Sequence, residues 1–422
     1  MGNKFDDLEK PSFTWHWRSL EDFKNTSWFT LGNYSNVILI VFFLALAFNQ
    51  IRRKNNEGKR IGYEKRYLKS PEFPEVEEQP EFDWKTTEPL QLRPFKPKYH
   101  LTMAESDDSA LEALPPSDLL LMDKNYADRI TYRRKIISEE GEHVVAVSDD
   151  HRIRPAVVEL YHFLMGTYLP LRFPPMFKLH EAFYEEGQTF MLENLVTKAL
   201  FAAKPSPRTT TKTLLETLGR TVDEEFLFLL REDEEESPDN KDKDYPTESN
   251  AKYVLQAYVC VCPSGFDPRE KLGKRLASIH DPVPGYPTKI EASMDRFFSR
   301  LEVGKYVKRA NWSITTNPNL YSAGKGTNHA HEGDDITEMK EIDVENTFLR
   351  CERQTLHRLP KSKAIVFAFK TYMYPIKEIK DEGKGEELAE AIDGLKEGNV
   401  PQMHFYKRGV VWGEAVKRYL RS

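Results

Sequence analysis

The chain has 422 residues, with 61 Lys and Arg against 67 Asp and Glu and a formal net charge of −6. This length allows one large domain or two ordinary ones. Nucleic acid is not a favoured partner, because no long basic block is interleaved with aromatic residues. Three cysteines, Cys260, Cys262 and Cys351, are too few and too badly spaced for a disulfide framework or a four-ligand zinc site. They suit a reducing compartment.

Residues 1–27 form a polar N-terminal segment with neither a myristoylation signal nor the basic start of a cleaved signal peptide. Residues 28–49 carry no charge, and Val37 to Phe48 are apolar throughout. Because about 20 apolar residues cross the hydrocarbon core of a bilayer, the sequence predicts a single transmembrane helix at 28–49. A buried core helix or an interfacial anchor is the alternative.

Basic residues follow this segment closely, from Arg52 to Lys69, whereas the preceding side is mixed in charge. The positive-inside rule therefore predicts a single-pass membrane protein with its C-terminal part in the cytosol. The short span favours the endoplasmic reticulum, with the mitochondrial outer membrane as the alternative. Residues 50–98 change from basic to acidic and Pro-rich, which predicts an extended tether.

Residues 99–422 are expected to form the soluble domain. Helical spacing of apolar residues predicts helices over 154–169 and 210–230 and a last helix near the C-terminus. Their apolar faces carry Val157, Leu160, Tyr161 and Leu164 in the first, Leu214, Leu218, Val222, Phe226 and Leu229 in the second, and Leu388, Ile392 and Leu395 in the last. Polar insertions are expected at about 231–250 and 321–343.

Strands are predicted over 253–263, 308–317, 346–360 and 363–376, where β-branched and aromatic residues are frequent. Several strands close together in sequence and preceded by helices indicate an α+β domain with a mainly antiparallel sheet. Alternation puts Arg309, Asn311 and Ser313 on one face of their strand. It likewise puts Arg350, Glu352 and Gln354 on one face of the next strand and Arg353 on the other.

Charged residues on strands need an explanation, since a buried charge is costly unless another charge or a ligand balances it. Arg309, Arg350, Glu352 and Arg353 are such residues. One interpretation is a structural Arg–Glu network that locks the register of the sheet. The other is a site for a charged ligand.

His280 lies at a Pro- and Gly-rich break over 279–287, before a helical pattern that ends near Leu301. A rigid turn can present an imidazole to a ligand, but a single histidine of this kind is usually a surface or hydrogen-bonded residue. His329 and His331 invite a metal interpretation, although two histidines in a Gly-rich loop usually bind nothing.

Several motifs together resemble the heme-dependent oxidative N-demethylase family, whose fungal members include the HRQ family. They are HDPVPGY, DRFF, ANWSI and RCERQTLHRLP, with LLMDKNYADRITYRRKII, VDEEFLFLL and TYMYP, in family order from Tyr99 to the C-terminus. The resemblance implies a PAS-like α+β heme-binding domain with flanking helices. It also implies that heme b and O2 remove a methyl group from a small secondary amine, with electrons from a separate flavin- and NADPH-dependent reductase.

The resemblance also implies roles for particular residues. His280 would bind the heme iron, and Glu352 would bind the substrate ammonium. Arg309 would be a catalytic residue that points into the distal pocket and could steady iron-bound oxygen, or would point towards a propionate. Arg353 would be structural or pair with a propionate. Contacts with the cofactor are expected for Tyr286 and Asn311 as well.

Two functions compete on these grounds. The first is a membrane-anchored, cytosol-facing heme-dependent oxidase that demethylates a small amine with external electrons, because the chain shows no flavin or nicotinamide fingerprint. The second is a non-catalytic PAS-like module that senses heme or a small ligand. A tethered scaffold without a cofactor is a third interpretation. A carboxylate placed for a cation, as expected of Glu352, separates the enzyme from the sensor.

Overall fold

The computed structural model describes residues 67–101, 111–184, 187–232, 251–324, 328–331, 333–334 and 336–422. The predicted polar segment at 1–27 and the predicted transmembrane helix at 28–49 lie outside these residues. Within the described ranges, no helix combines the length and apolar character that a membrane span requires.

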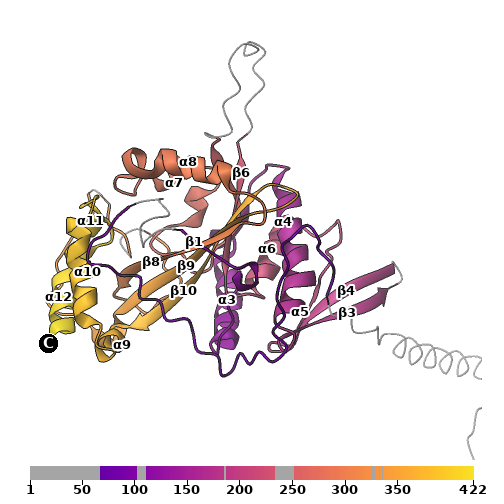
Figure 1. Ribbon diagram of the computed structural model, residues 1–422, viewed down its shortest axis with the longest axis horizontal. Coiled ribbons are helices and arrows are strands. Elements are labelled where there is room, and N and C mark those ends of the chain that lie inside the picture. The colour runs from indigo at the N-terminus through magenta and orange to yellow at the C-terminus, as the bar shows by residue number, and fades with distance from the viewer. Residues whose placement is uncertain are drawn as a thin grey trace, which may run out of the picture. The chain divides into compact units, whose positions relative to one another are not determined.

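An antiparallel sheet forms the centre of the domain (Figure 1), and its strand order is β1-β8-β9-β10-β6-β7-β2. Every neighbouring pair is antiparallel, so the predicted mainly antiparallel α+β class is confirmed. The strands are β1 (Glu112–Ala113), β2 (Val145–Val147), β6 (Glu225–Arg231), β7 (Tyr253–Val259), β8 (Tyr306–Thr315), β9 (Phe348–Arg358) and β10 (Ile365–Pro375).

A second, small antiparallel sheet has the order β3-β4-β5 and projects to one side in Figure 1. Its strands are β3 (Phe177–Tyr184), β4 (Gly187–Asn194) and β5 (Ala199–Ala202). Short 3-10 turns connect elements elsewhere in the domain. They are η2 (Pro116–Asp118), η3 (Gly141–His143), η6 (Pro268–Lys271) and η8 (Val344–Asn346).

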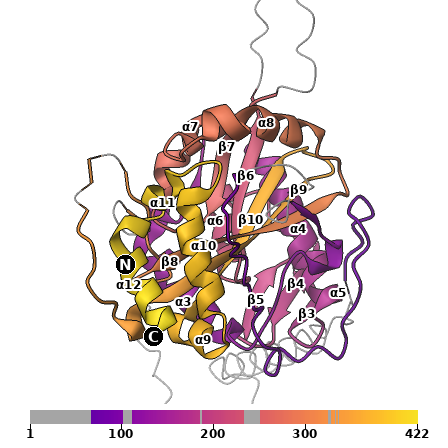
Figure 2. The ribbon, with the colours of Figure 1, turned by 60° about the vertical axis from the view of Figure 1, so that its left-hand side comes forward.

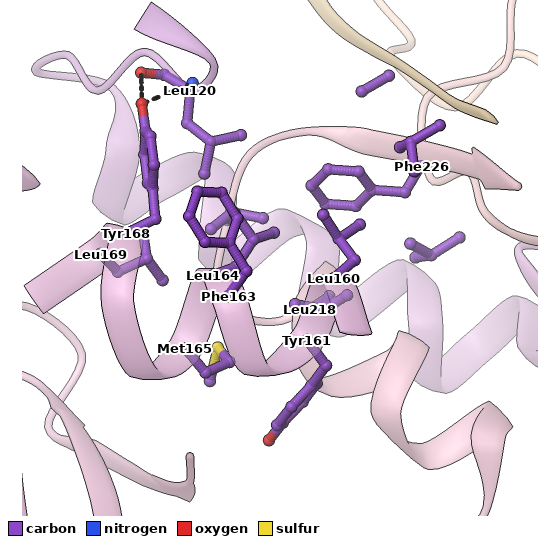
Figure 3. Close-up of a cluster of buried hydrophobic side chains, with 14 of the residues drawn as sticks. Leu120, Leu160, Tyr161, Phe163, Leu164, Met165, Tyr168, Leu169, Leu218 and Phe226 are labelled. Atoms are coloured by element: carbon purple, nitrogen blue, oxygen red, sulfur yellow. Dashed lines mark hydrogen bonds between the residues drawn. The ribbon is translucent and has the colours of Figure 1, made fainter. Parts of the chain in front are cut away.

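Four helices build the larger hydrophobic core against the central sheet, as Figure 3 shows in part. They are α3 (Tyr126–Glu140), α4 (Ile153–His162), α5 (Leu169–Arg172) and α6 (Thr211–Gly219), and a π-helical turn, η4 (Phe163–Tyr168), joins α4 to α5. The predicted helix over 154–169 is confirmed, because its apolar face is buried. The Tyr168 hydroxyl accepts from the Leu120 amide at 3.1 Å and donates to the Ser117 carbonyl at 2.7 Å.

The prediction of one helix over 210–230 is wrong in its second half. Helix α6 ends at Gly219, where a Cβ atom would lie 2.6 Å from a methyl carbon of Val259. Residues Glu225–Arg231 form β6, a strand buried on both faces. A continuous apolar run such as FLFLL suits a strand of this kind, and its periodicity alone does not distinguish it from a buried helix.

The prediction of an extended tether over 50–98 also differs from the structure, in the part that is described. Residues 67–98 contain no helix or strand, but Phe73, Val76 and Phe95 are buried in the two main hydrophobic clusters. The Phe73 ring stacks on Phe163 with ring centroids 3.9 Å apart. The Pro-rich composition predicted the irregular backbone, but not the burial of its widely spaced aromatic residues.

The remaining helices are α7 (Leu276–His280), η7 (Tyr286–Ile290, π-helical), α8 (Glu291–Arg300), α9 (Ile376–Asp381), α10 (Gly385–Glu397), α11 (Met403–Tyr406) and α12 (Gly409–Arg421). In Figures 1 and 2, α7 and α8 lie at the upper end of the long strands, and α10 to α12 pack together on one side. The predicted burial of Leu388, Ile392 and Leu395 in α10 is confirmed.

The two predicted insertions differ in outcome. Most of 231–250 lies outside the described residues. The segment 321–343 is not a freely solvated loop where it is described, because Asn328 and Ala330 are buried and the Met339 amide donates to the Val411 carbonyl at 2.8 Å. The polar composition of this segment gave no indication of these few contacts.

Candidate active site

Strand register brings the predicted site residues of β8 and β9 together. Asn311 is the Cα partner of Glu352, and Arg309 is the partner of Gln354. Directly opposite residues of an antiparallel pair project to the same side of the sheet. Arg309, Asn311, Glu352 and Gln354 therefore share one face, as the alternation of the sequence predicts, and we call this side of β8, β9 and β10 the site face.

The site face is partly open over its central strands. Leu227 of β6, Phe367 of β10 and Val307 of β8 are only half-buried, although other strands flank all three. Leu227 and Phe367 pack against a small cluster built on Leu255, Tyr258, Cys260 and Phe369. Apolar side chains that remain partly exposed in the middle of a sheet form a suitable floor for an apolar ligand.

His280 ends helix α7, next to this face. Its Nδ1 lies 2.8 Å from the Leu276 carbonyl oxygen, and because a carbonyl only accepts, Nδ1 carries the hydrogen and donates it. The lone pair is then on Nε2, the tautomer that a metal-binding histidine needs. Burial lowers the pKa of His280 to about 4, the Leu276 carbonyl partly offsets this, and the charges of Arg309 and Lys271 lower it further. The imidazole is therefore neutral near pH 7.

Tyr286 packs directly against the imidazole of His280. Its ring stacks on His280 with centroids 4.7 Å apart and planes within 9° of parallel. The Tyr286 side chain is fully buried, and its hydroxyl lies 3.4 Å from the Met294 sulfur. Gly285, with φ +74°, makes the turn between the two rings, where a Cβ would come within 2.8 Å of Val400.

Arg309 is half-buried on β8, and its Nε is buried without a hydrogen-bond partner. Its positive charge lowers the pKa values of His280, Tyr99 and Lys407, so these groups surround it. A guanidinium with an unused donor beside an imidazole suits an anionic group such as a carboxylate.

Glu352 is buried and accepts a hydrogen bond from the Gln354 amide at 2.9 Å. Across the described ranges, no Lys, Arg or His nitrogen lies within 4.0 Å of its carboxylate. A buried carboxylate without an ion-pair partner is expected where a cationic ligand binds. Asn311, next to it, accepts from Lys407 Nζ at 3.1 Å, so its amide oxygen is already engaged.

Arg353 does not lie on the site face with Arg309, Asn311 and Glu352. It projects from the opposite face of β9, and its guanidinium donates to the backbone carbonyls of Asp118 and Leu119. This placement fits the structural alternative for Arg353, since the sheet separates it from Glu352.

Sequence reasoning missed Tyr99, Tyr406 and Lys407 as site residues. Burial raises the pKa of Tyr406, and the charge of Glu352 adds to this shift, so Tyr406 lies near the carboxylate. The Tyr406 ring stacks on His329 with centroids 4.4 Å apart. No motif marks these residues, because the fold brings them to β8 and β9 from opposite ends of the domain. In the described part of the chain, no group of three or more possible ligands forms a metal site with His329.

Charged residues of α3, β6, β10 and the neighbouring loops form a separate, largely buried ion-pair network. Arg129 pairs with Asp223 at 2.9 Å, Arg133 with Glu225 at 2.5 Å and Lys370 with Asp123 at 2.7 Å. Glu225 also accepts from the Val261 amide at 2.6 Å. This network joins α3 to the sheet, so the structural interpretation of strand charges applies here.

Comparison with protein-family models matches residues 110–417 to the family described as Haem-dependent oxidative N-demethylase, alpha subunit-like. The chain belongs to this family. The match covers most of the domain described above, including every predicted site residue.

The residues of this N-demethylase-like domain fit a heme. His280 presents a neutral Nε2, the half-buried Leu227 and Phe367 offer apolar contact, and Arg309 has an unused donor for a propionate. These three features lie around one face of one sheet. His280 would hold the iron, with the Leu276 carbonyl orienting its ring.

Proposed function

We propose that this chain is a heme-dependent oxidase that removes a methyl group from a small secondary amine, with O2 and external electrons, and releases formaldehyde. The observation that carries the proposal is the unpaired Glu352 carboxylate on the same open face as Arg309, whose charge in turn acts on the neutral His280. A heme-binding module alone has no use for a carboxylate placed for a cation.

Heme bound at His280 would supply the activation of O2 and the oxidation of the methyl group. The protein residues bind and orient the amine. Glu352 accepts a hydrogen bond from an N–H group of the ammonium, and the side-chain amide of Gln354 donates to the carboxylate and holds it in place. Burial strengthens this charge pair, because little water competes with it.

We further propose that the domain is PAS-like. The strand order supports this, since the hairpin β6–β7 lies beside β10, the last strand of the β8–β9–β10 meander. That arrangement leaves one face of the central strands free for a cofactor.

The electron source and the location belong to the proposal too. We propose a separate flavin- and NADPH-dependent reductase, supported by the lack of a dinucleotide fingerprint in the sequence. The apolar run from Val37 to Phe48 supports a single-pass anchor in the endoplasmic reticulum with the domain in the cytosol. Extraction of membranes with carbonate tests the anchor, since release of the full-length protein would contradict it.

The absorption spectrum of the full-length protein, purified in detergent after expression with ample heme, tests the cofactor. We expect a Soret band in the wild type and in His151→Ala, an exposed histidine, and its loss or marked shift in His280→Ala. A wild type without a Soret band would refute the proposed function.

Formaldehyde release from methylated amines, with an artificial reductant, separates an oxidase from a sensor. Glu352→Gln keeps the shape but not the charge, so we expect a loss of amine binding of about 2 kcal/mol or more, with the Soret band retained. Heme binding without turnover of any methylated amine would favour the sensor.

A further inference from the structure

Three lysines are buried in the described part of the chain, and one of them differs from the others. Lys370 lies 2.7 Å from Asp123, and Lys417 lies 2.5 Å from Asp393. Lys407 is equally buried, with 4% of its surface exposed, but no carboxylate of the described residues lies within 4.0 Å of it. A buried ammonium without a counter-ion is costly and is expected at functional sites.

Lys407 projects into the candidate site from the turn between α11 and α12. Its Nζ donates to Asn311 Oδ1 at 3.1 Å and to the Trp312 carbonyl at 2.5 Å. The rings of Tyr99 and Trp312 lie 5.2 and 5.3 Å from Nζ. Arg408, with φ +60°, makes the turn that starts α12. The amine thus lies at the same position along β8 as Asn311, the Cα partner of Glu352.

Charged and titratable groups face Lys407 from three directions. Arg309 comes from β8, Glu352 and Cys351 come from β9, and His329 comes from the segment after β8. Burial lowers the pKa of Lys407 to about 8, the charge of Arg309 lowers it further, and Glu352 and Cys351 oppose the shift. A second cation beside Glu352 would favour the neutral amine still more.

We propose, as an extension of the proposed function, that Lys407 accepts the proton of the substrate ammonium that Glu352 binds. In this step an N–H bond of the ammonium breaks and an N–H bond to Lys407 Nζ forms. The electron pair of the broken bond stays on the substrate nitrogen, so nothing is oxidised. The step matters because only the neutral amine has a lone pair that can stabilise the carbon as its C–H bond is oxidised.

The neighbouring groups are unsuited to this role. A carboxylate is a far weaker base than an alkylamine, and a guanidinium offers hydrogen-bond donors but no acceptor. His280 donates through Nδ1 to the Leu276 carbonyl, and the proposed function assigns its remaining nitrogen, Nε2, to the heme iron. Among the described groups beside Glu352, Lys407 is the base whose pKa, at about 8, lies nearest to that of an alkylammonium.

The proposal predicts that amine binding releases a proton. Alkylamines in solution are cations, and after transfer the site holds a single ammonium, on Lys407. Where Lys407 is protonated before binding, its own proton must leave. We therefore expect about one proton released per amine well below pH 8 and almost none well above it.

Calorimetric titration of the heme-loaded, full-length protein with dimethylamine, in buffers of different ionisation enthalpy, measures this number. Lys407→Met should abolish proton release at every pH, bind the amine at least as tightly, and lower turnover of the bound amine about 100-fold. Lys407→Arg keeps a charge that cannot be lost and should weaken amine binding about 10-fold. Lys417→Met, the matched buried lysine, should retain the wild-type proton release.

The outcomes distinguish this proposal from the proposed function. Amine binding by the wild type without proton release between pH 6 and 8 would overturn the role of Lys407 and leave the demethylase proposal intact. Unchanged proton release in Lys407→Met would do the same. Failure of the wild type to bind any methylated amine would remove both. The wild-type titration needs no variant, so a lack of proton release overturns the role of Lys407 even if Lys407→Met does not fold. Undiminished turnover in Lys407→Met would overturn it as well, because repulsion between two cations can release the proton of Lys407 without any transfer from the amine.

Discussion

Buried charged side chains have different kinds of partner on the two faces of β9 and β10. On the face away from the site, Arg353 donates to two carbonyls and Lys370 pairs with Asp123. On the site face, Arg350 is held by backbone carbonyls such as that of Cys262, whereas Glu352 accepts only from the Gln354 side-chain amide and Arg309 keeps an unused donor. Paired charges hold the fold together, whereas unpaired charges destabilise it and are expected where a ligand completes them. Pairing, rather than burial, therefore separates structural from functional charges here.

Glu224 is an exception to this rule, and its protonation explains why. Glu224 is buried and one of its carboxyl oxygens has no hydrogen-bond partner. Burial raises the pKa of Glu224 to about 8, with Arg353 and Lys370 opposing the shift. The group is therefore a neutral acid near pH 7 and needs no counter-ion.

The largest expected effect comes from breaking the ion-pair network. Asp223→Ala leaves Arg129 without its partner and removes a charge near Arg133 and Lys370. We expect the free energy of unfolding to fall by about 3–5 kcal/mol, because the uncompensated cations stay buried. Urea denaturation followed by circular dichroism measures this.

Glu352→Gln is the matched control on the other face. It removes a charge that has no cationic partner, so the free energy of unfolding should change by less than about 1 kcal/mol or increase. Equal losses in Asp223→Ala and Glu352→Gln would contradict the distinction between the two faces.

The stability of the domain should also depend on apolar packing in the larger hydrophobic core, to which residues 67–98 contribute. Phe73→Ala removes a ring stacked on Phe163 and should lower the free energy of unfolding by about 3 kcal/mol. Phe183→Ala, at a position with 55% of its surface exposed, should change it by less than about 0.5 kcal/mol. A negligible effect of Phe73→Ala would restore the tether interpretation of residues 67–98.

A third expected effect concerns pH. His357 lies on the face away from the site, fully buried against Tyr306, and neither ring nitrogen has a hydrogen-bond partner. Burial lowers the pKa of His357 to about 3. Below about pH 6.5 the unfolded chain binds a proton that the folded chain does not, so stability falls as the pH decreases toward the folded pKa.

His357→Phe should remove this dependence. Between pH 7 and pH 5, the wild type should lose about 2 kcal/mol more stability than the variant. Urea denaturation at several pH values measures the difference, with the exposed His151→Ala as control. Parallel pH profiles of stability for the wild type and His357→Phe would contradict this prediction, because they would mean that His357 binds a proton equally well in the folded and unfolded states.

Strand periodicity predicted one part of the site well. Alternation alone put Arg309 with Asn311, and Glu352 with Gln354, on shared faces, because side chains project alternately from a strand. It did not supply the register that makes Asn311 and Glu352 partners, since that depends on the packing of segments about forty residues apart.

Local sequence patterns could not predict other parts of the fold and the site. The apolar run after Gly219 matched a helical period by coincidence, and only burial between β10 and β7 makes it a strand. Lys407 and Tyr99 reach the site from the two ends of the domain, so no motif joins them to Glu352. The proposed role of His280 as heme ligand rests on the family resemblance, and the structure adds the tautomer of its imidazole.

The smallest expected effect tests what orients His280. The Tyr286 hydroxyl meets only the Met294 sulfur, a weak acceptor, whereas its ring covers the imidazole. Tyr286→Phe should therefore change the free energy of unfolding by about 0.5 kcal/mol and leave the Soret band unchanged. Tyr286→Leu removes the stacked ring and should shift the band. If Tyr286→Phe shifted the band as much as Tyr286→Leu, the hydroxyl would be acting on the heme site directly, and the site face would extend beyond the open centre of the sheet to the turn at Gly285.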